Sequence, residues 1–306
     1  MVEQVKETKG EKRNRDLQAM GPWRVAWERF RKNKLSMAGA IILGIIVLLV
    51  ILVPIISPYS LNELNLPNKL QAPSSAHWLG TDEQGRDVLM RVFMGGRISI
   101  KIGVLTAGVT VILGALVGGI AGYYGGWVDN LLMRFTEIVY SLPFYPLVIT
   151  LSFVLMWDVS SEMKMYIVML ILALLSWPGL ARIIRGQILS LREQDFMVAT
   201  KALGISTKSK ILRHLLPNTL AYIIVNATLG MGGAILTEAS LSFLGLGVIP
   251  PTPTWGNMIE RARDTYIFTK NPWVWIPPGV LIILTVVSIN LLGEGLRDAF
   301  DPKEIR

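Results

Sequence analysis

Residues 77–87 contain four side chains that could bind a metal ion or move a proton in catalysis. They are His77, Asp82, Glu83 and Asp87. No second histidine follows at the spacing of a metal site, and no convergent partner is evident. Gly80 and Gly85 instead suit tight turns, in which aspartate side chains accept hydrogen bonds from the backbone. We therefore predict a folded loop at 77–87 rather than a metal or hydrolase centre.

A second polar stretch, residues 194–217, could act through binding rather than chemistry. A short helix is predicted just after Gln194, and helical spacing would place three of its side chains on one apolar face. The face consists of Phe196, Ala199 or Thr200, and Leu203. Gly204 can adopt the positive φ that ends such a helix. An ordered apolar face favours insertion into a groove on another protein over a loose loop.

The second half of this stretch predicts another, more basic helix. Ser206 is a suitable N-cap for it, because a serine side chain accepts a backbone hydrogen bond in the first turn. Its basic side chains are Lys208, Lys210, Arg213 and His214. Pro217 then begins the next apolar segment. The alternative is an ordinary positively charged loop whose lysines face lipid.

The composition places both stretches in a membrane protein. The mean hydropathy is +0.48, and only 17% of residues are charged, against about a quarter in soluble domains. The chain has no cysteine, which excludes disulfides, thiol nucleophiles and thiolate metal sites. The net charge of +8 does not by itself indicate nucleic acid, because its distribution matters more than its total.

Six apolar runs free of charge predict an all-α membrane protein with six transmembrane helices. A helix needs about 20 residues to cross the hydrocarbon core. The runs are Met37–Ile56, Ile102–Tyr124, Ile138–Trp157, Met165–Ala181, Leu215–Thr237 and Asn271–Gly293. Met165–Ala181 is short and contains Pro178, so we expect a kink or an extension through Arg182. None of the runs carries a charge at its centre, which counts against an ion-coupled carrier.

The distribution of basic residues predicts the orientation. Most Lys and Arg residues lie in the tail 1–36 and the loop 182–214, and such segments stay in the cytoplasm. Both termini are therefore predicted to be cytoplasmic, and the loops 57–97 and 238–270 extracytoplasmic. Trp23, Trp27 and Phe30 recur at helical spacing among arginines and lysines. They indicate either an amphipathic helix in the lipid headgroups or a basic flank of the first span.

Small residues recur in two of the runs, where another helix can approach closely. The second run has Gly114, Gly118, Gly122 and Gly126, and the fifth has Gly230, Gly232, Gly233 and Ala234. Packing within one chain is the favoured interpretation, and a pore lining or a subunit contact is the alternative. Arg134 and Glu137 are predicted to form an ion pair between residues three apart.

Residues 238–257 join an apolar stretch to a proline-rich one. Ser240–Leu246 is too short to span a membrane, and Pro250, Pro251 and Pro253 stop any helix. We expect a re-entrant or interfacial segment near the outer mouth. It could serve as a gate, as a docking surface, or only in packing.

Four motifs carry a resemblance to a known family. Ala199-Thr-Lys-Ala-Leu-Gly204, followed by Ile211 and Leu216-Pro217-Asn218, resembles the "EAA" cytoplasmic loop of ABC importer permeases. Residues 77–87, 238–247 and 290–302 are similar to the permeases of dipeptide and oligopeptide importers, specifically the C-type subunit. The sequence departs from the family pattern at Val198, where the family has its glutamate, and at Thr200, where it has an alanine.

This resemblance implies a loop that docks onto an ATP-hydrolysing subunit and couples its closure to the membrane helices. The coupling residues would be Phe196, Val198, Ala199, Thr200, Lys201, Leu203, Gly204, Ile211, Arg213, His214, Leu216 and Pro217. The implied partners are a second homologous permease, two cytoplasmic ATPase subunits, an extracytoplasmic substrate-binding protein and membrane lipid, with no nucleic acid. The implied location is the plasma membrane of a prokaryote.

The chain itself is expected to be a non-catalytic transport subunit. It lacks the G-x-x-x-x-G-K-[ST] phosphate loop, so ATP and Mg would be bound by the partner subunits, and no cofactor is expected in this chain. The expected divisions are a cytoplasmic tail with an amphipathic helix (1–35), a first span with an extracytoplasmic loop (36–98), an importer transmembrane domain (99–300) and a cytoplasmic tail (301–306). The transported solute is expected to be a peptide. The alternatives are nickel or another small solute, an ion-coupled carrier, and an intramembrane hydrolase.

Overall fold

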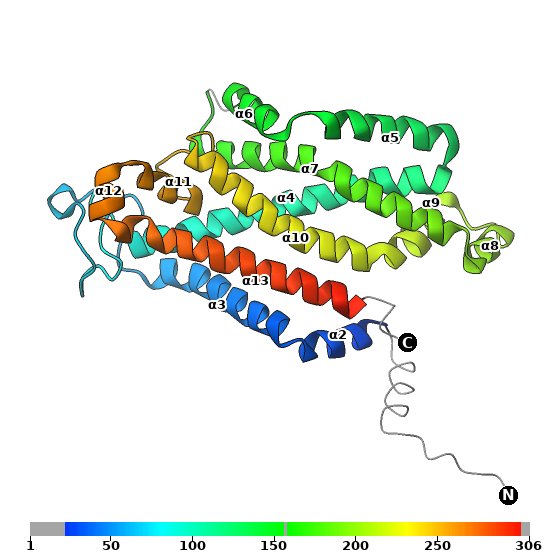
Figure 1. Cartoon of the computed structure of the whole chain (residues 1–306), viewed down its shortest axis with the longest axis horizontal. Coiled ribbons are helices and arrows are strands. Elements are labelled where there is room, and N and C mark those ends of the chain that lie inside the picture. The colour runs from blue at the N-terminus through cyan, green and yellow to red at the C-terminus, as the bar shows by residue number, and fades with distance from the viewer. Residues whose placement is uncertain (1–21, 156–157, 301–306) are drawn as a thin grey trace, which may run out of the picture.

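The computed structural model describes residues 22–155 and 158–300, and this part of the chain is mostly helical, with no strand. Five long helices run side by side along the longest axis of the molecule (Figure 1). They are α3 (Lys34–Ile56), α4 (Val88–Tyr124), α7 (Ser161–Arg192), α10 (Leu216–Phe243) and α13 (Ile276–Phe300). Each contains a segment long and apolar enough to cross a membrane, in agreement with the predicted all-α membrane fold.

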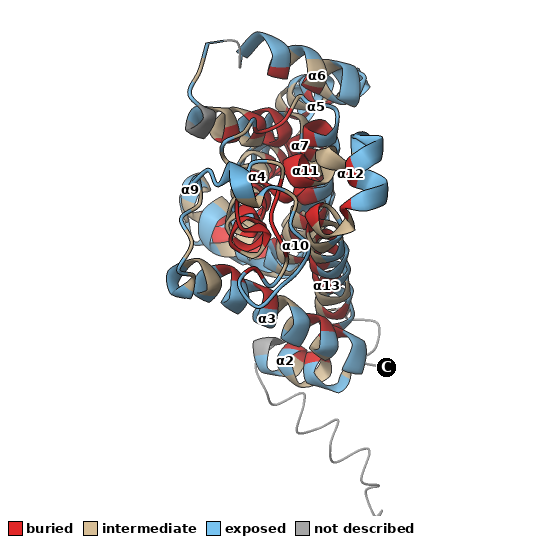
Figure 2. Ribbon diagram, turned by 90° about the vertical axis from the view of Figure 1, so that its left-hand side faces the viewer, coloured by how far each residue is buried: buried red, intermediate tan, exposed pale blue. Residues whose placement is uncertain are grey.

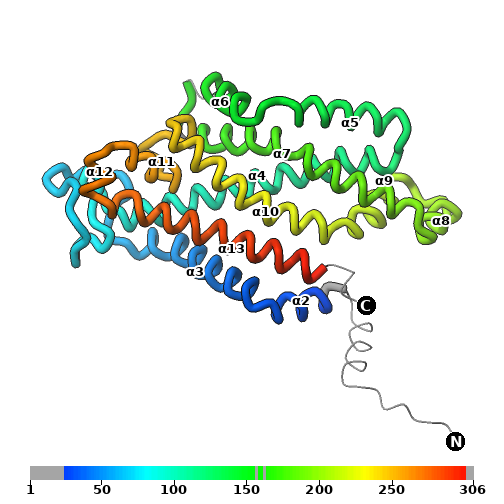
Figure 3. Tube along the Cα trace, viewed as in Figure 1, coloured from blue at the N-terminus to red at the C-terminus, as the bar shows by residue number. Residues whose placement is uncertain are grey.

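Short helices gather at the two ends of this bundle (Figures 1 and 3). One end, called here the α8 end, carries α2 (Pro22–Lys32), α8 (Asp195–Ala202) and α9 (Thr207–Ser209). The opposite end, called here the α11 end, carries the loop 57–87 with η1 (Leu66–Asn68), then α11 (Trp255–Ile259), η3 (Glu260–Arg263), α12 (Thr265–Lys270) and η4 (Pro272–Val274). The first and last described residues both lie at the α8 end.

The third apolar run does not form the single helix expected over Ile138–Trp157. It is split between α5 (Gly126–Ser141) and α6 (Phe144–Leu155), which meet at an angle of 82°. Pro143 explains the break, because a proline disfavours helical geometry in the preceding residue, and Leu142 is extended with ψ 135°. Trp157 lies outside the described residues. The described chain therefore has five candidate spans, or six if the bent pair counts as one.

The fourth run is longer than its apolar core suggested. α7 continues through Arg182 to Arg192 and contains Pro178, which confirms the expected extension. α4 also begins well before Ile102, because Asp87 caps its first turn: a carboxylate oxygen accepts a hydrogen bond from the backbone N–H of Met90 at 2.8 Å.

A proline in the first long helix is compensated by the second. Pro54 lies within α3 and has no N–H to donate to the carbonyl of Val50. Arg97 of α4 replaces that donor: its Nε lies 2.8 Å from the Val50 oxygen, and its other nitrogen lies 2.6 Å from the oxygen of Ile51. Because a carbonyl left unpaired in lipid costs several kcal/mol, this contact stabilises both α3 and its pairing with α4.

The glycines of α4 hold α7 close to it. A side chain at Gly118 would place its Cβ 2.3 Å from the carbonyl oxygen of Ala181, and Gly114 and Gly122 face α7 at similarly short distances. The predicted packing within one chain is confirmed for these three glycines. Gly126 does not belong to the stripe, because it lies beyond the end of α4 with φ +53° and nothing near its Cβ.

The buried residues gather where α4, α7, α10 and α11 meet, whereas the outer faces of α3, α6 and α12 are largely exposed (Figure 2). Trp255 of α11 is completely buried, and its indole nitrogen donates to the carbonyl of Val92 in α4 at 2.9 Å. It packs in one apolar cluster with Phe93, Ile235 and Ile289. This cluster ties the α11 end to the long helices.

The amphipathic helix α2 packs on protein rather than presenting all its aromatic residues to lipid. Ala26 and Phe30 are buried against Ala299 near the end of α13, whereas Trp27 is exposed. Of the expected aromatic face, Phe30 therefore turns inward and Trp27 outward, and the side chain of Trp23 lies outside the described residues. Arg24 and Arg31 remain exposed on the same helix.

The sequence suggested a separate re-entrant or interfacial segment that includes Ser240–Leu246. The described part of the chain does not contain such a segment. The first part of Ser240–Leu246 completes α10, which ends at Phe243, and only Leu244 onward is non-helical. Glu238 is completely buried one turn earlier and accepts a hydrogen bond from the Ser242 hydroxyl at 2.7 Å. This last part of α10 packs against α11. The packing explains why α10 continues to Phe243, although its apolar run ends at Thr237.

Candidate functional site

Residues 194–217 form two helical pieces joined at a glycine, as predicted (Figure 3). α8 ends in a Schellman motif: the N–H of Gly204 bonds to the carbonyl of Lys201, and the N–H of Ile205 bonds to that of Thr200, both at 3.1 Å. Gly204 has φ +66°, which confirms the expected left-handed corner. The hydroxyl of Ser206 then accepts from the N–H of Ser209 at 3.4 Å, which confirms the expected N-cap.

The expected apolar face of α8 is divided in the structure. Met197 and Thr200 are buried, and Phe196 is half-buried beside them, whereas Leu203 is 77% exposed. Of the predicted face of Phe196, Ala199 or Thr200, and Leu203, the residues Ala199 and Leu203 are exposed, whereas Phe196 and Thr200 turn inward. The reason is that Met197, which the pattern did not single out, anchors α8 in the cluster formed by α7 and the start of α10.

The outward face of α8 consists of other residues. Val198 is 58% exposed, and Ala199 and Ala202 are exposed with it. Residues three and four apart share a helix face, so Val198 and Ala202 adjoin on the surface, as do Ala199 and Leu203. The corner therefore presents a small apolar surface, called here the α8 surface, made of Val198, Ala199, Ala202 and Leu203.

The second helical piece does not stand apart from the membrane helix. α9 runs through a π-helical turn, η2 (Lys210–Leu215), directly into α10. Pro217 at the start of α10 cannot donate a backbone hydrogen bond, and π turns accommodate such losses of register. The Asn218 side chain donates to the carbonyl of His214 at 2.6 Å in the same turn. A displacement of α9 would therefore act directly on α10.

Most of the remaining predicted coupling residues are at the surface. The exposed ones are Lys201, Gly204, Arg213 and Pro217, and His214 is half-buried. Ile211 and Leu216 are half-buried instead, and both approach Gly119 of α4. The structure thus brings Ile211 and Leu216 together on the inner side, and leaves the four exposed residues facing outward.

A bidentate ion pair near the α8 end was not foreseen from the sequence. Asp129 of α5 is nearly buried, and its two carboxylate oxygens lie 2.5 and 2.6 Å from nitrogens of Arg185 in α7. One turn away, Arg182 lies 4.0 Å from the ring centre of Tyr140. The expected Arg134–Glu137 pair is also present, at 3.3 Å. Only the long sequence separation between α5 and α7 concealed the Asp129 contact.

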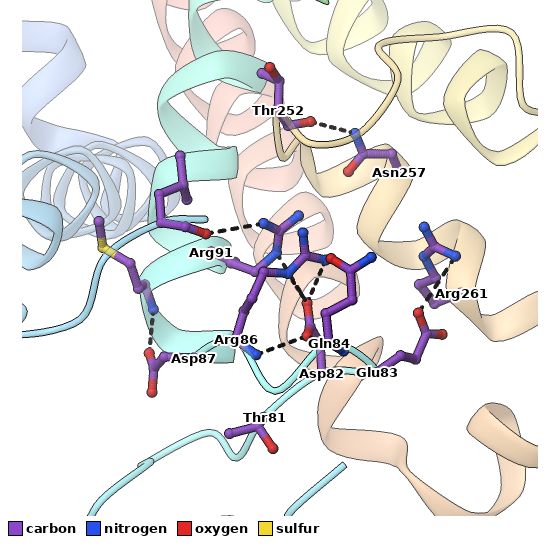
Figure 4. A network of polar contacts seen from close by, with 12 residues as sticks. Thr81, Asp82, Glu83, Gln84, Arg86, Asp87, Arg91, Thr252, Asn257 and Arg261 are labelled. Atoms are coloured by element: carbon purple, nitrogen blue, oxygen red, sulfur yellow. Dashed lines mark hydrogen bonds and ion pairs between the residues drawn. The ribbon is translucent and has the colours of Figure 1, made fainter. Parts of the chain in front are cut away.

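The polar loop at the α11 end is organised around one carboxylate (Figure 4). Asp82 accepts hydrogen bonds from the backbone of Gln84 and Arg86 and pairs with the Arg86 side chain at 2.7 Å. Arg91 of α4 lies 3.4 Å from the same carboxylate. All three charged side chains are buried, so the loop is a folded structure as predicted.

The other candidate metal or catalytic side chains are also engaged with protein groups. Asp87 caps α4 with one oxygen and lies 2.8 Å from Nδ1 of His77 with the other. Glu83 pairs at 3.6 Å with Arg261, which joins this loop to η3. Burial raises the pKa of the Glu83 carboxyl, and Arg261 partly opposes that rise. Within the described residues, no three His, Asp or Glu side chains lie close enough together to bind a metal ion.

These features define a multi-pass helical membrane protein: a bundle of apolar helices, a buried polar loop at one end, and an ordered apolar surface at the other. The sequence of residues 114–306 matches the family "Binding-protein-dependent transport system inner membrane component", and residues 21–73 match the "N-terminal TM domain of oligopeptide transport permease C". The chain belongs to the family of binding-protein-dependent transport permeases.

Curated relatives extend over nearly the whole chain. The dipeptide transport system permease protein DppC of Alkalihalophilus pseudofirmus is 40% identical over 93% of this chain and 91% of its own length. The oligopeptide transport system permease protein OppC of Bacillus subtilis is 37% identical over 99% and 97%. The glutathione transport system permease protein GsiD of Escherichia coli is 39% identical over 94% and 92%.

Proposed function

We propose that this chain is a transmembrane subunit of an ATP-driven peptide importer, forms half of the translocation pathway, and receives motion from an ATPase through residues 194–217. The observation that carries this proposal is the α8 surface: four apolar side chains held outward by a buried anchor and a glycine corner. Exposed apolar side chains on an ordered turn are suited to a protein groove. The names of the three relatives support peptides as the transported class.

The proposed topology has six spans, with the bent α5–α6 pair as the third, and both termini in the cytoplasm. The positive charge of 1–36 and 182–214 supports this orientation. The tail 1–35, the first span and outer loop 36–98, the importer domain 99–300 and the tail 301–306 remain the proposed divisions. The proposed location is the plasma membrane of a prokaryote.

The proposed partners are a second related permease, two ATPase subunits that bind ATP and Mg, and an extracytoplasmic substrate-binding protein. Val198 lies on the α8 surface at the position where the resemblance implies a glutamate. The contact with the ATPase therefore rests on apolar packing and on the shape of the turn more than on a charge at this position. Lys201, an exposed residue of the same helix, adds positive charge beside it.

Nickel is the second candidate solute, and neither the structure nor the relatives favours it. Transition metals are held by imidazole, thiolate and carboxylate ligands. The chain has no cysteine and two histidines, and His77 is already paired with Asp87. Membership in a binding-protein-dependent family likewise counts against an ion-coupled carrier.

The test replaces the apolar contact with a charge. Leu203→Asp should abolish co-purification of the ATPase and ATP-dependent uptake of a labelled tripeptide, since a carboxylate would enter an apolar groove. Trp27→Asp, a charge at another exposed apolar position of the same end, is the matched control and should retain both. Normal ATPase binding by Leu203→Asp would refute the docking proposal. Uptake of nickel but of no peptide by wild-type cells would refute the proposal that the solute is a peptide.

A further inference from the structure

A cavity of about 400 Å³ lies among α4, α6, α7 and α10. Its volume is in the range of small-molecule sites. Thr106 and Thr110 contribute from α4, Ser176 from α7, and Asn226 and Thr237 from α10. Thr106, Thr110 and Ser176 lie near the middle of long apolar helices, and Thr237 lies toward the α11 end of α10, so most of the cavity would sit inside the membrane.

The cavity is lined by polar groups that lack full hydrogen bonding within the described chain. The Thr110 hydroxyl is buried and has no partner. Asn226 donates its amide nitrogen to the carbonyl of Tyr222 at 2.8 Å, and its amide oxygen is left without a donor among the described contacts. The Thr106 hydroxyl reaches the carbonyl of Met169 only at 3.5 Å. Of these three groups, only the Thr110 hydroxyl is both buried and unpaired, and because buried polar groups are normally paired, it favours a polar occupant.

Glycines keep this cavity open. Gly179 of α7 and Gly230 and Gly233 of α10 line it, and a Cβ added at any of the three would meet no atom within 4 Å. Helix packing does not require these glycines, in contrast to Gly118, where a Cβ would strike the backbone of α7. Their absent side chains contribute to the volume of the cavity.

We propose that this cavity binds the main chain of the transported peptide, an inference that rests on the proposed function. No residue lining it is charged, and the hydroxyl and amide groups can both donate and accept, as a peptide main chain does. A site of this kind pairs with the backbone groups common to all peptides and discriminates little among their side chains. A metal ion would find no imidazole or carboxylate there.

The absence of cysteine from the chain allows a direct test in cells or proteoliposomes that contain the complete transporter. Ser176→Cys and Gly230→Cys each place one thiol in the cavity. Gly186→Cys is the matched control, because Gly186 lies on α7 outside the cavity and a Cβ there also meets nothing within 4 Å. The probe is a cationic methanethiosulfonate, and the unmodified chain shows the background from partner subunits.

Modification of Ser176→Cys and Gly230→Cys should lower trialanine uptake by about tenfold, equivalent to about 1.4 kcal/mol. Saturating trialanine should slow the labelling of both, and Ala-Lys-Ala and Ala-Glu-Ala should slow it to a similar extent. Gly186→Cys should show neither effect. Uptake that survives labelling, or protection by only one of the three peptides, would overturn main-chain recognition.

Two further variants distinguish a polar occupant from a lipid chain. Thr110→Val and Asn226→Leu remove the unpaired groups and should each reduce uptake severalfold while leaving ATPase co-purification intact. Wild-type uptake in both would indicate that hydrocarbon fills the cavity and would overturn the proposal. Failure of the unmodified chain to support any peptide uptake would instead refute the proposed function itself.

Discussion

Replacing Gly204 with valine tests the coupling segment most directly. Gly204 has φ +66°, and a Cβ at this position would meet nothing within 4 Å. The added Cβ therefore meets no neighbour, and the main effect of the substitution comes from the backbone. Either valine accepts the left-handed conformation, or the corner opens and the Schellman hydrogen bonds from Gly204 and Ile205 break.

A left-handed valine and an opened corner destabilise the folded protein by similar amounts. A left-handed conformation costs an L-residue about 1–2 kcal/mol. Loss of two exposed hydrogen bonds costs about 1 kcal/mol each. Valine also has less conformational entropy than glycine in the unfolded chain, which stabilises the folded state by about 0.4–1 kcal/mol. The net loss of about 1 kcal/mol is too small to unfold the protein, but an opened corner would displace Leu203 and the α8 surface.

The assay compares Gly204→Val with Gly245→Val. Gly245 has φ +78°, ends α10 in the same hydrogen-bonding motif, and likewise has open space at its Cβ, but lies at the α11 end. Both variants should insert into membranes and melt slightly below the wild type. Only Gly204→Val should lose ATPase co-purification and peptide uptake. Equal ATPase binding by the two variants would show that the corner does not position the docking surface.

Three other predictions concern stability, measured by thermal unfolding in detergent. Arg97→Leu should cost about 1–3 kcal/mol, because it leaves helix carbonyls unpaired, and the cost should shrink in a Pro54→Ala background, where α3 regains its own donor; equal costs in both backgrounds would contradict this. Asp129→Asn and Arg185→Gln should show a coupling energy of about 1–2 kcal/mol in a double-mutant cycle, and additive effects would contradict the observed pairing. Because burial raises the pKa of the folded-state Glu83 above its ordinary 4.5, folding binds a proton, so stability should fall as pH rises through that raised value. Glu83→Gln should flatten this decline, and an unchanged pH profile would refute the assignment.

Local chemistry was predictable wherever one residue type decides the conformation. Gly204 and Ser206 were identified from the sequence because a left-handed corner and an N-cap depend on the residue itself. The glycines of α4 were identified as packing sites by their spacing. The break at Pro143 could also have been predicted from the proline itself. It was missed because the apolar run continues across it, and hydropathy gives no information on the angle between two helices.

The sequence by itself determined the class of protein, the apolar helices, the charge asymmetry and the helix–glycine–helix form of residues 194–217, because each depends on composition or on neighbours along the chain. Only the tertiary structure decided which face of α8 is exposed, because Met197 is anchored by residues of α7 and α10 that lie far from it in sequence. The same holds for Asp129 with Arg185, for Arg97 beside Pro54, and for the cavity, whose walls come from four separate helices.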